Sequence, residues 1–227
     1  MSSAADFASL PATEWGRTMA GKGRWLTGFG CGLAVLALAA EPASAHHVMG
    51  GRMPVTFGEG LLSGLGHPII GLDHFAAVVA VGALAAAHRA GALLALAFVA
   101  AMMAGVAAHL GGTTVPGAEL LVALTVVGLG LAMVRNPPLS TAAALTLFSI
   151  AGLVHGYALG ESIYGAERSP LAAYLIGLAV IQSAVALAAM SLARMAARRE
   201  TMAVRFAGAC IAGIGLAFLA QQIVPAA

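Results

Sequence analysis

The chain has 227 residues, of which 60% are hydrophobic and only 9% are charged. A soluble domain of this size carries roughly a quarter of its residues as charged side chains, so the composition argues against a water-soluble fold and indicates a lipid bilayer as solvent. The formal net charge of +2, without a basic stripe, argues against a nucleic-acid partner. The two cysteines, Cys31 and Cys210, are too few and too far apart for a disulfide framework or a thiolate metal site.

Residues 1–45 have the pattern of an export signal. Basic residues precede an apolar stretch at about 29–40, and Ala43-Ser44-Ala45 then gives the small-x-small pattern of a cleavage site. We predict cleavage after Ala45, which leaves residues 46–227 as one membrane domain. Met19 is an alternative start for the signal, and an uncleaved first helix is the alternative to cleavage.

The predicted mature chain offers six mostly apolar stretches, and a bilayer-crossing helix needs about 20 such residues. They lie at roughly 69–87, 91–110, 118–134, 139–159, 170–190 and 203–224. The links between them are rich in Gly, Pro and basic residues, which end helices or favour turns. We therefore predict an all-α membrane protein, a six-transmembrane-helix bundle that follows a cleaved N-terminal signal peptide.

The arginines indicate how this bundle is oriented. If the mature N-terminus lies outside, the links after the first, third and fifth spans face the cytoplasm, where basic residues are favoured. These links and the start of the last span hold Arg89, Arg135, Arg194, Arg198, Arg199 and Arg205, whereas the outer segments hold Arg52 and Arg168. We predict a multi-pass protein of the bacterial inner membrane whose mature N-terminus and C-terminus are periplasmic.

Ionisable side chains within spans are costly and usually functional. On the predicted topology they gather near the outer ends of the spans: His67, Asp73, His74, His109, Glu119, His155 and Glu161. Only His88 falls on the cytoplasmic side, where it is expected to be an ordinary loop residue. Imidazole and carboxylate together suit a borderline divalent cation such as nickel, cobalt or zinc.

The start of the first span is the strongest candidate for a metal site. His67 and His74 are seven residues apart, which on a continuous helix separates them by about 10 Å, too far for one ion. Pro68 and Gly71 lie between them, and a broken or re-entrant turn would bring His67 toward Asp73 and His74. We therefore expect His67, Asp73 and His74 to capture a metal ion at the outer end of the first span, rather than this segment serving only to anchor the chain in the membrane.

Five of these residues also have a structural alternative. Asp73 and His74 would also fit a polar bridge that locks the bundle, His109 an interface position, and Glu119 a carboxylate favoured by a helix start. His155 lies beside a glycine ridge formed by Gly152, Gly156 and Gly160, which permits close helix packing and does not by itself make a ligand.

The predicted new N-terminus adds two further imidazoles. Cleavage after Ala45 would expose an α-amine on His46, with His47 directly behind it. Together they would chelate a divalent cation on the periplasmic side, in front of the first span. The alternative is a solvated tail without a role.

The segment "HPIIGLDHFAAVVAVGALAA" resembles the signature of the HupE/UreJ family, the hydrogenase/urease accessory permeases, whose first span carries His-Pro-x-x-Gly-x-Asp-His. "PGAELLVALTVVGLGLAM" and "HGYALGES" resemble the third and fourth spans of the family. The resemblance implies a six-span permease for nickel, sometimes cobalt. It also implies ligand or pathway roles for His67, Asp73, His74, Glu119 and His155. The chain departs from the family at Leu159, where the fourth-span motif has a second histidine, and at Gln182 and Ser183, where relatives often have a Leu-His pair.

The leading functional prediction is uptake of a divalent transition-metal cation, nickel first and cobalt second, to supply metalloenzyme maturation. His67, Asp73, His74 and His155 would form the site, while Glu119 and Glu161 concentrate the cation. Histidine must be neutral to bind a metal, so uptake should fall as the pH drops through about 6.5. The expected partners are the transported ion, the lipid bilayer and metallochaperones of hydrogenase or urease maturation, with no prosthetic group.

Two alternative functions remain open. One is an intramembrane zinc-dependent hydrolase in which Ser63 or Ser162 accompanies the histidines and an activated water. The other is a membrane metal sensor or chaperone that does not transport.

Overall fold

A computed structural model describes residues 52–135, 138–199 and 201–223 of the chain. These residues form seven helices: α3 (Phe57–Ile70), α4 (Leu72–Ala85), α5 (Gly91–Leu110), α6 (Ala118–Val134), α7 (Thr141–Glu161), α8 (Arg168–Arg199) and α9 (Thr201–Ile223). Over this part of the chain the expected all-α class is confirmed. The predicted signal peptide at 1–45 and the histidines His46 and His47 lie outside the described residues.

Four helices, α5, α7, α8 and α9, are long and apolar enough to cross a membrane. Helices α3 and α4 together make a fifth candidate span, bent by 77° at the break between them. Helix α6 is a shorter apolar helix of 17 residues. The predicted ranges 91–110 and 118–134 coincide with α5 and α6, whereas α8 continues beyond the predicted end at 190 to Arg199.

The predicted first span, 69–87, is wrong in its start, because a helix already begins at Phe57. Thr56 and Glu59 form a capping box: the Thr56 hydroxyl accepts the Glu59 N–H at 3.2 Å, and the Glu59 carboxylate accepts the Thr56 N–H at 3.2 Å. Such a pair satisfies backbone donors that a helix start leaves unpaired. Glycine and polar residues dilute the hydropathy of α3, so it does not stand out as an apolar stretch.

The break between α3 and α4 lies at Gly71, whose backbone is extended with φ −70° and ψ 99°. Gly71 donates its N–H to the carbonyl of His67 at 3.0 Å, and its own carbonyl accepts the N–H of Phe75 at 2.9 Å. Pro68, one turn earlier, has no N–H to continue the helical ladder. The last turn of α3 and the first turn of α4 therefore meet at an angle around Gly71.

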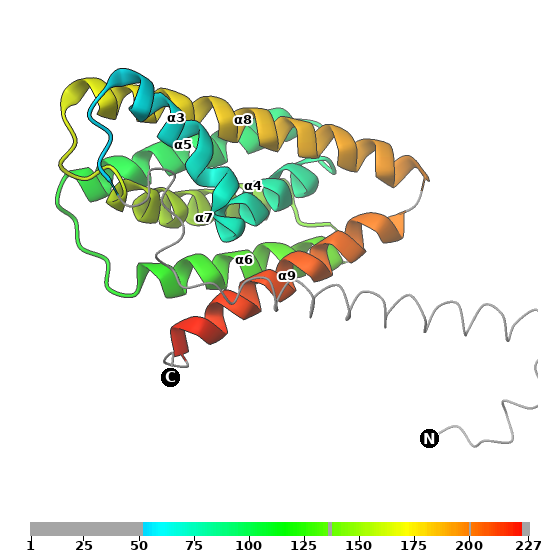
Figure 1. Cartoon of the computed structure of the whole chain (residues 1–227). Coiled ribbons are helices and arrows are strands. Elements are labelled where there is room, and N and C mark those ends of the chain that lie inside the picture. The colour runs from blue at the N-terminus through cyan, green and yellow to red at the C-terminus, as the bar shows by residue number, and fades with distance from the viewer. Residues whose placement is uncertain (1–51, 136–137, 200, 224–227) are drawn as a thin grey trace, which may run out of the picture.

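Helix α4 occupies the centre of the bundle and contacts all six other described helices. Most of its residues are small, and Ala77, Ala80 and Val81 have no exposed surface. Figure 1 shows α3 and α8 running together along one side of the molecule, and α6 and α9 along the other.

Glycines bring the remaining helices together in three close pairs. Gly60 and Gly64 of α3 lie against Pro170 and Tyr174 of α8, so these two helices run parallel. Helices α5 and α7 also run parallel, because Gly152 and Gly160 of α7 meet α5 in ascending order along both chains, at Phe98 and at Val106 and His109. In the third pair, α6 and α9 run antiparallel, with Gly130 of α6 against Gly208 and Gly215 of α9 against Val127.

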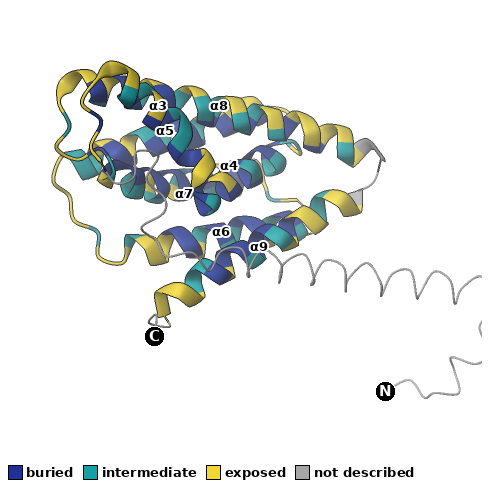
Figure 2. Cartoon of the chain, in the orientation of Figure 1, coloured by how far each residue is buried: buried dark blue, intermediate teal, exposed yellow. Residues whose placement is uncertain are grey.

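The glycine ridge predicted on α7 is a packing surface. A methyl group at Gly156 would overlap the backbone of Met102, and one at Gly160 would lie 2.8 Å from Cβ of His109. Small residues of this kind let membrane helices approach closely. The outer faces instead carry exposed large apolar side chains, among them Leu93, Leu131, Ile150, Ile176 and Leu216, and Figure 2 shows the exposed surface on the outside of the bundle. A surface of this kind suits lipid.

Candidate metal centre

Two imidazoles from helices far apart in the sequence meet inside the bundle. His74, in the first turn of α4, and His155, in α7, place their Nδ1 atoms 2.8 Å apart, with ring centroids 5.0 Å apart. His155 has no exposed surface, and His74 is 7% exposed. The Gly156 contact with α5 holds this part of α7 in place, while the helix break at Gly71 sets the start of α4.

Thr125 of α6 fixes the proton on His155. The Thr125 hydroxyl donates to the carbonyl of Val122 at 2.7 Å, so its single hydrogen is in use. Towards His155 Nε2, 2.9 Å away, the same hydroxyl must therefore accept, which places the hydrogen of a neutral His155 on Nε2. The lone pair of His155 then sits on Nδ1 and faces His74.

His67 and Asp73 lie beside this pair. The rings of His67 and His74 have centroids 6.3 Å apart, and both His67 and Asp73 are buried, at 8% and 7% exposed. Asp73 accepts the backbone N–H of His74 on Oδ1 at 2.8 Å. Gly71 closes the group, because a methyl there would lie 3.0 Å from Cδ2 of His74 and 3.3 Å from Oδ1 of Asp73. The three residues predicted to capture the metal, His67, Asp73 and His74, are thus brought together at the helix break.

These residues bring two ring nitrogens together, joined by a hydrogen bond that His74 Nδ1 donates to His155 Nδ1, and a cation bound by both nitrogens would replace that hydrogen. Among the described residues, no group of three or more His, Cys, Asp or Glu side chains is positioned to hold one metal ion. The His74 and His155 Nδ1 atoms, 2.8 Å apart, match two neighbouring ligands of one ion, since nitrogens about 2.1 Å from a metal and at right angles are about 3 Å apart. His67 is the next imidazole, with its ring centroid 6.3 Å from that of His74.

The other predicted site residues lie at the end of the bundle where α5 ends and α6 begins. Glu119, in the first turn of α6, and Glu161, the last residue of α7, are exposed. His109 packs against Tyr157 and Tyr164, with ring centroids 4.7 Å and 5.6 Å away. This setting is that of an interface residue between helices, the structural alternative to a ligand.

Two polar residues of this region were missed by reasoning from the sequence. Thr125 is the only hydroxyl residue in α6, an otherwise apolar helix apart from Glu119, and that isolation was a usable signal. Gln182 of α8 was noticed only as a departure from the family pattern, yet its side chain is 1% exposed.

The serines named for a hydrolase have other settings. The Ser162 hydroxyl donates to the carbonyl of Leu159 at 2.9 Å and lies 3.1 Å from the Tyr174 hydroxyl, so it ties α7 to α8. Ser63 is buried in α3, at 6% exposed. The geometry of Ser162 therefore gives no support to a nucleophile activated by histidine.

These apolar helices, with buried imidazoles at a helix break, define a multi-pass membrane protein with a candidate cation site. The chain belongs to the HupE / UreJ protein family, whose model matches residues 33–218, and this confirms the resemblance found in the sequence. It is similar to Protein HupE of Rhizobium leguminosarum bv. viciae, with 37% identity over 130 residues, which cover 56% of this chain and 64% of that protein. The match therefore spans less than two thirds of that relative's length. No solved structure gives a significant match.

Proposed function

We propose that this protein takes up a first-row divalent cation, nickel first and cobalt second, across the cytoplasmic membrane to supply metalloenzyme maturation. The observation that carries the proposal is the His74–His155 pair, with two ring nitrogens 2.8 Å apart inside a bundle of apolar helices. Membership in the HupE / UreJ protein family supports the same function.

The position of the pair supports transport rather than storage on a surface. Interrupted helices at membrane depth are tolerated where they line a path or are buried in protein, and transporters commonly place ion sites at such breaks. Here His67 lies in the last turn of α3, and Asp73 and His74 lie in the first turn of α4. Asp73 contributes the negative charge that offsets part of the cost of bringing a divalent cation out of water.

The spacing of the nitrogens suits one shared ion. An ion about 2.1 Å from both atoms of a pair 2.8 Å apart would see them at an angle of about 84°, near the 90° between neighbouring ligands of a square-planar or octahedral ion such as Ni²⁺.

A third ligand is available without rebuilding the bundle. His67 stands at the end of α3, on the far side of the break from His74, and their ring centroids are 6.3 Å apart. A change of backbone angles at Gly71 would bring the two rings to one ion. We infer that the cation is captured by His74 and His155 and that His67 joins on closure at the break.

The proposed orientation places the pair nearer the periplasm. Arg194 donates to the carbonyl of His88 at 3.2 Å, and Arg205 to that of Val134 at 3.1 Å, so these arginines gather with the ends of α4 and α6. The positive-inside rule assigns that end to the cytoplasm. The relative directions of the three helix pairs agree with alternating crossings if α3 and α4 count as one. Hydrogenase or urease metallochaperones remain the proposed partners.

The test is nickel and cobalt accumulation at trace concentration in cells with and without the gene. Replacing Asp73 or His74 with Ala should abolish accumulation while membrane abundance stays close to that of the parent. His88→Ala is the matched control, because His88 lies just beyond the far end of α4 and, within the described residues, its side chain has one hydrogen-bond contact, at 3.3 Å to Thr141. A parent that accumulates neither metal above an empty vector would overturn transport, and normal accumulation by both variants would overturn the site.

A further inference from the structure

Gln182 of α8 carries a buried oxygen that nothing nearby satisfies. The side chain is 1% exposed, and its Nε2 lies 2.8 Å from Sδ of Met102 in α5. Within the described part of the chain, Oε1 has no hydrogen-bond partner. Leaving a buried acceptor unpaired costs about 1–3 kcal/mol, so such a group calls for an explanation.

The orientation of the amide follows from the chemistry of its neighbour. A thioether sulfur is a weak acceptor and favours the NH₂ group of the carboxamide. Turning the amide over would set two electron-rich atoms, the oxygen and the sulfur, against each other. Met102 therefore holds the nitrogen and leaves the oxygen of Gln182 directed elsewhere.

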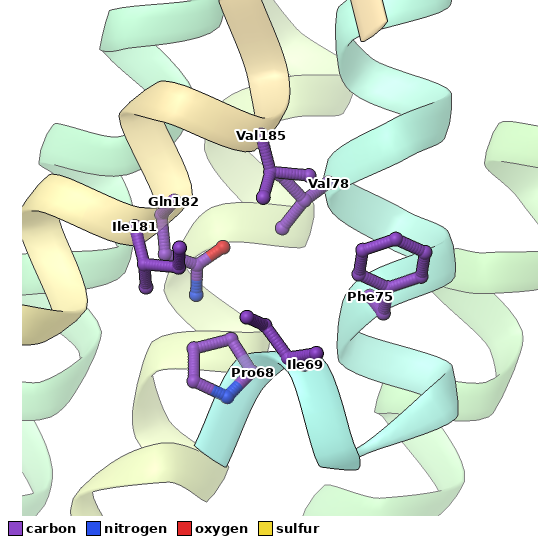
Figure 3. A pocket seen from close by; sticks show the side chains of 7 residues that line it. All are labelled: Pro68, Ile69, Phe75, Val78, Ile181, Gln182 and Val185. Carbon is purple, nitrogen blue, oxygen red and sulfur yellow. The ribbon is translucent and has the colours of Figure 1, made fainter. Parts of the chain in front are cut away.

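The Gln182 side chain lies among residues that adjoin the candidate metal centre in sequence. Figure 3 shows it over a narrow crevice between α8 and the α3–α4 break, lined also by Pro68, Ile69, Phe75, Val78, Ile181 and Val185. Pro68 directly follows His67, and Phe75 directly follows His74. Met102, which holds the amide, packs against Gly156, the neighbour of His155. The carboxamide is thus close to residues that adjoin each of the three proposed imidazole ligands.

We propose that Gln182 Oε1 is a further ligand of the transported cation and determines its metal preference. This inference rests on the proposed function and adds a residue to the same site. An amide oxygen is neutral and harder than imidazole, so it adds affinity without adding charge. A transport site must hold its ion firmly enough to load and weakly enough to release, and a weak oxygen ligand beside two imidazoles meets both needs.

Two substitutions separate this role from packing. Gln182→Leu removes the oxygen at similar volume and also removes an unpaired buried acceptor, so folding should not suffer. We expect it to raise the nickel concentration for half-maximal uptake about tenfold, with unchanged membrane abundance. Gln182→His replaces the oxygen with an imidazole, and we expect a lower half-maximal concentration, a slower maximal rate and a higher ratio of nickel to manganese uptake. Ser183→Ala, on the neighbouring residue, is the matched control and should behave as the parent does.

Equilibrium dialysis of the purified full chain with nickel chloride distinguishes failure of this inference from failure of the proposed function. Weaker nickel binding in Gln182→Leu than in the parent supports the ligand even if cells show no uptake. Equal binding and equal uptake in the two proteins would show that the oxygen is no ligand and holds at most a water. A nickel-to-manganese ratio unchanged in Gln182→His would overturn the role in metal preference.

Discussion

Thr125→Val tests whether the proton arrangement around His155 matters for metal capture. Valine keeps the branched shape of threonine and removes only the hydroxyl, which lies 2.9 Å from His155 Nε2. Without that acceptor the Nε2 hydrogen is left unpaired in a fully buried site. The ring then gains by moving its hydrogen to Nδ1, the atom that faces His74 at 2.8 Å. Capture of a cation by both Nδ1 atoms would then require the His155 hydrogen to return to Nε2, where no hydroxyl accepts it.

The size of the effect follows from the role of a residue behind a ligand. Groups that orient a metal-binding histidine contribute about 10- to 100-fold in metal affinity. That range corresponds to about 1.4–2.7 kcal/mol. We expect the dissociation constant for nickel in Thr125→Val to rise within this range, with membrane abundance close to that of the parent because the packing volume is kept.

The assay is equilibrium binding of nickel to purified parent, Thr125→Val and Thr125→Ser, followed by uptake in cells. Serine keeps the hydroxyl, so Thr125→Ser should remain within a few-fold of the parent. If the valine and serine variants bind nickel equally well, the hydroxyl does not set the tautomer of His155, and its hydrogen bond to Val122 has no bearing on metal capture. Equal binding with unequal uptake would confine Thr125 to a step after capture.

Two further predictions concern the helix break and the topology. Gly71→Ala places a methyl 3.0 Å from Cδ2 of His74, so we expect nickel uptake to fall about tenfold. Gly128→Ala is the control and should be neutral, because a methyl there meets nothing within 4 Å. Equal uptake by the two variants would contradict a role for the break. Reporter fusions after Ala90 should be active only in the cytoplasm and those after Gly165 only in the periplasm; the same side for both would break the alternating topology.

The sequence predicted helices well where hydropathy alone decides them. The ranges of α5 and α6 were predicted to the residue because Gly and Pro interrupt continuous apolar stretches at both ends. Helix α3 was missed because its glycines and polar residues lower its hydropathy. Its sequence signal was instead the Thr56-x-x-Glu59 capping box, which marks a helix start independently of hydropathy.

The candidate site was predictable only in part, for a related reason. His67, Asp73 and His74 are close in sequence, and Pro68 with Gly71 made a helix break foreseeable. The pairing of His74 with His155 joins residues 81 positions apart, and no periodicity encodes which helices become neighbours. The proposed roles of Thr125 and Gln182 depend on contacts with atoms of other helices, and the sequence does not show those contacts.

The polar contacts near the break join helices that belong to different units of the bundle, and this bears on how a cation would move. The three close pairs, α3 with α8, α5 with α7 and α6 with α9, are held by glycine contacts between backbones, and such contacts leave little room for sliding. His155 to Thr125 and Gln182 to Met102 each join helices of different pairs, and His74 to His155 joins the central helix α4 to one of them. We expect the pairs to move as units and these polar joints to open and close. A cation that replaces the hydrogen bond between His74 and His155 would change the joint between α4 and the α5–α7 pair, so loading the site and shifting the helices would be one event.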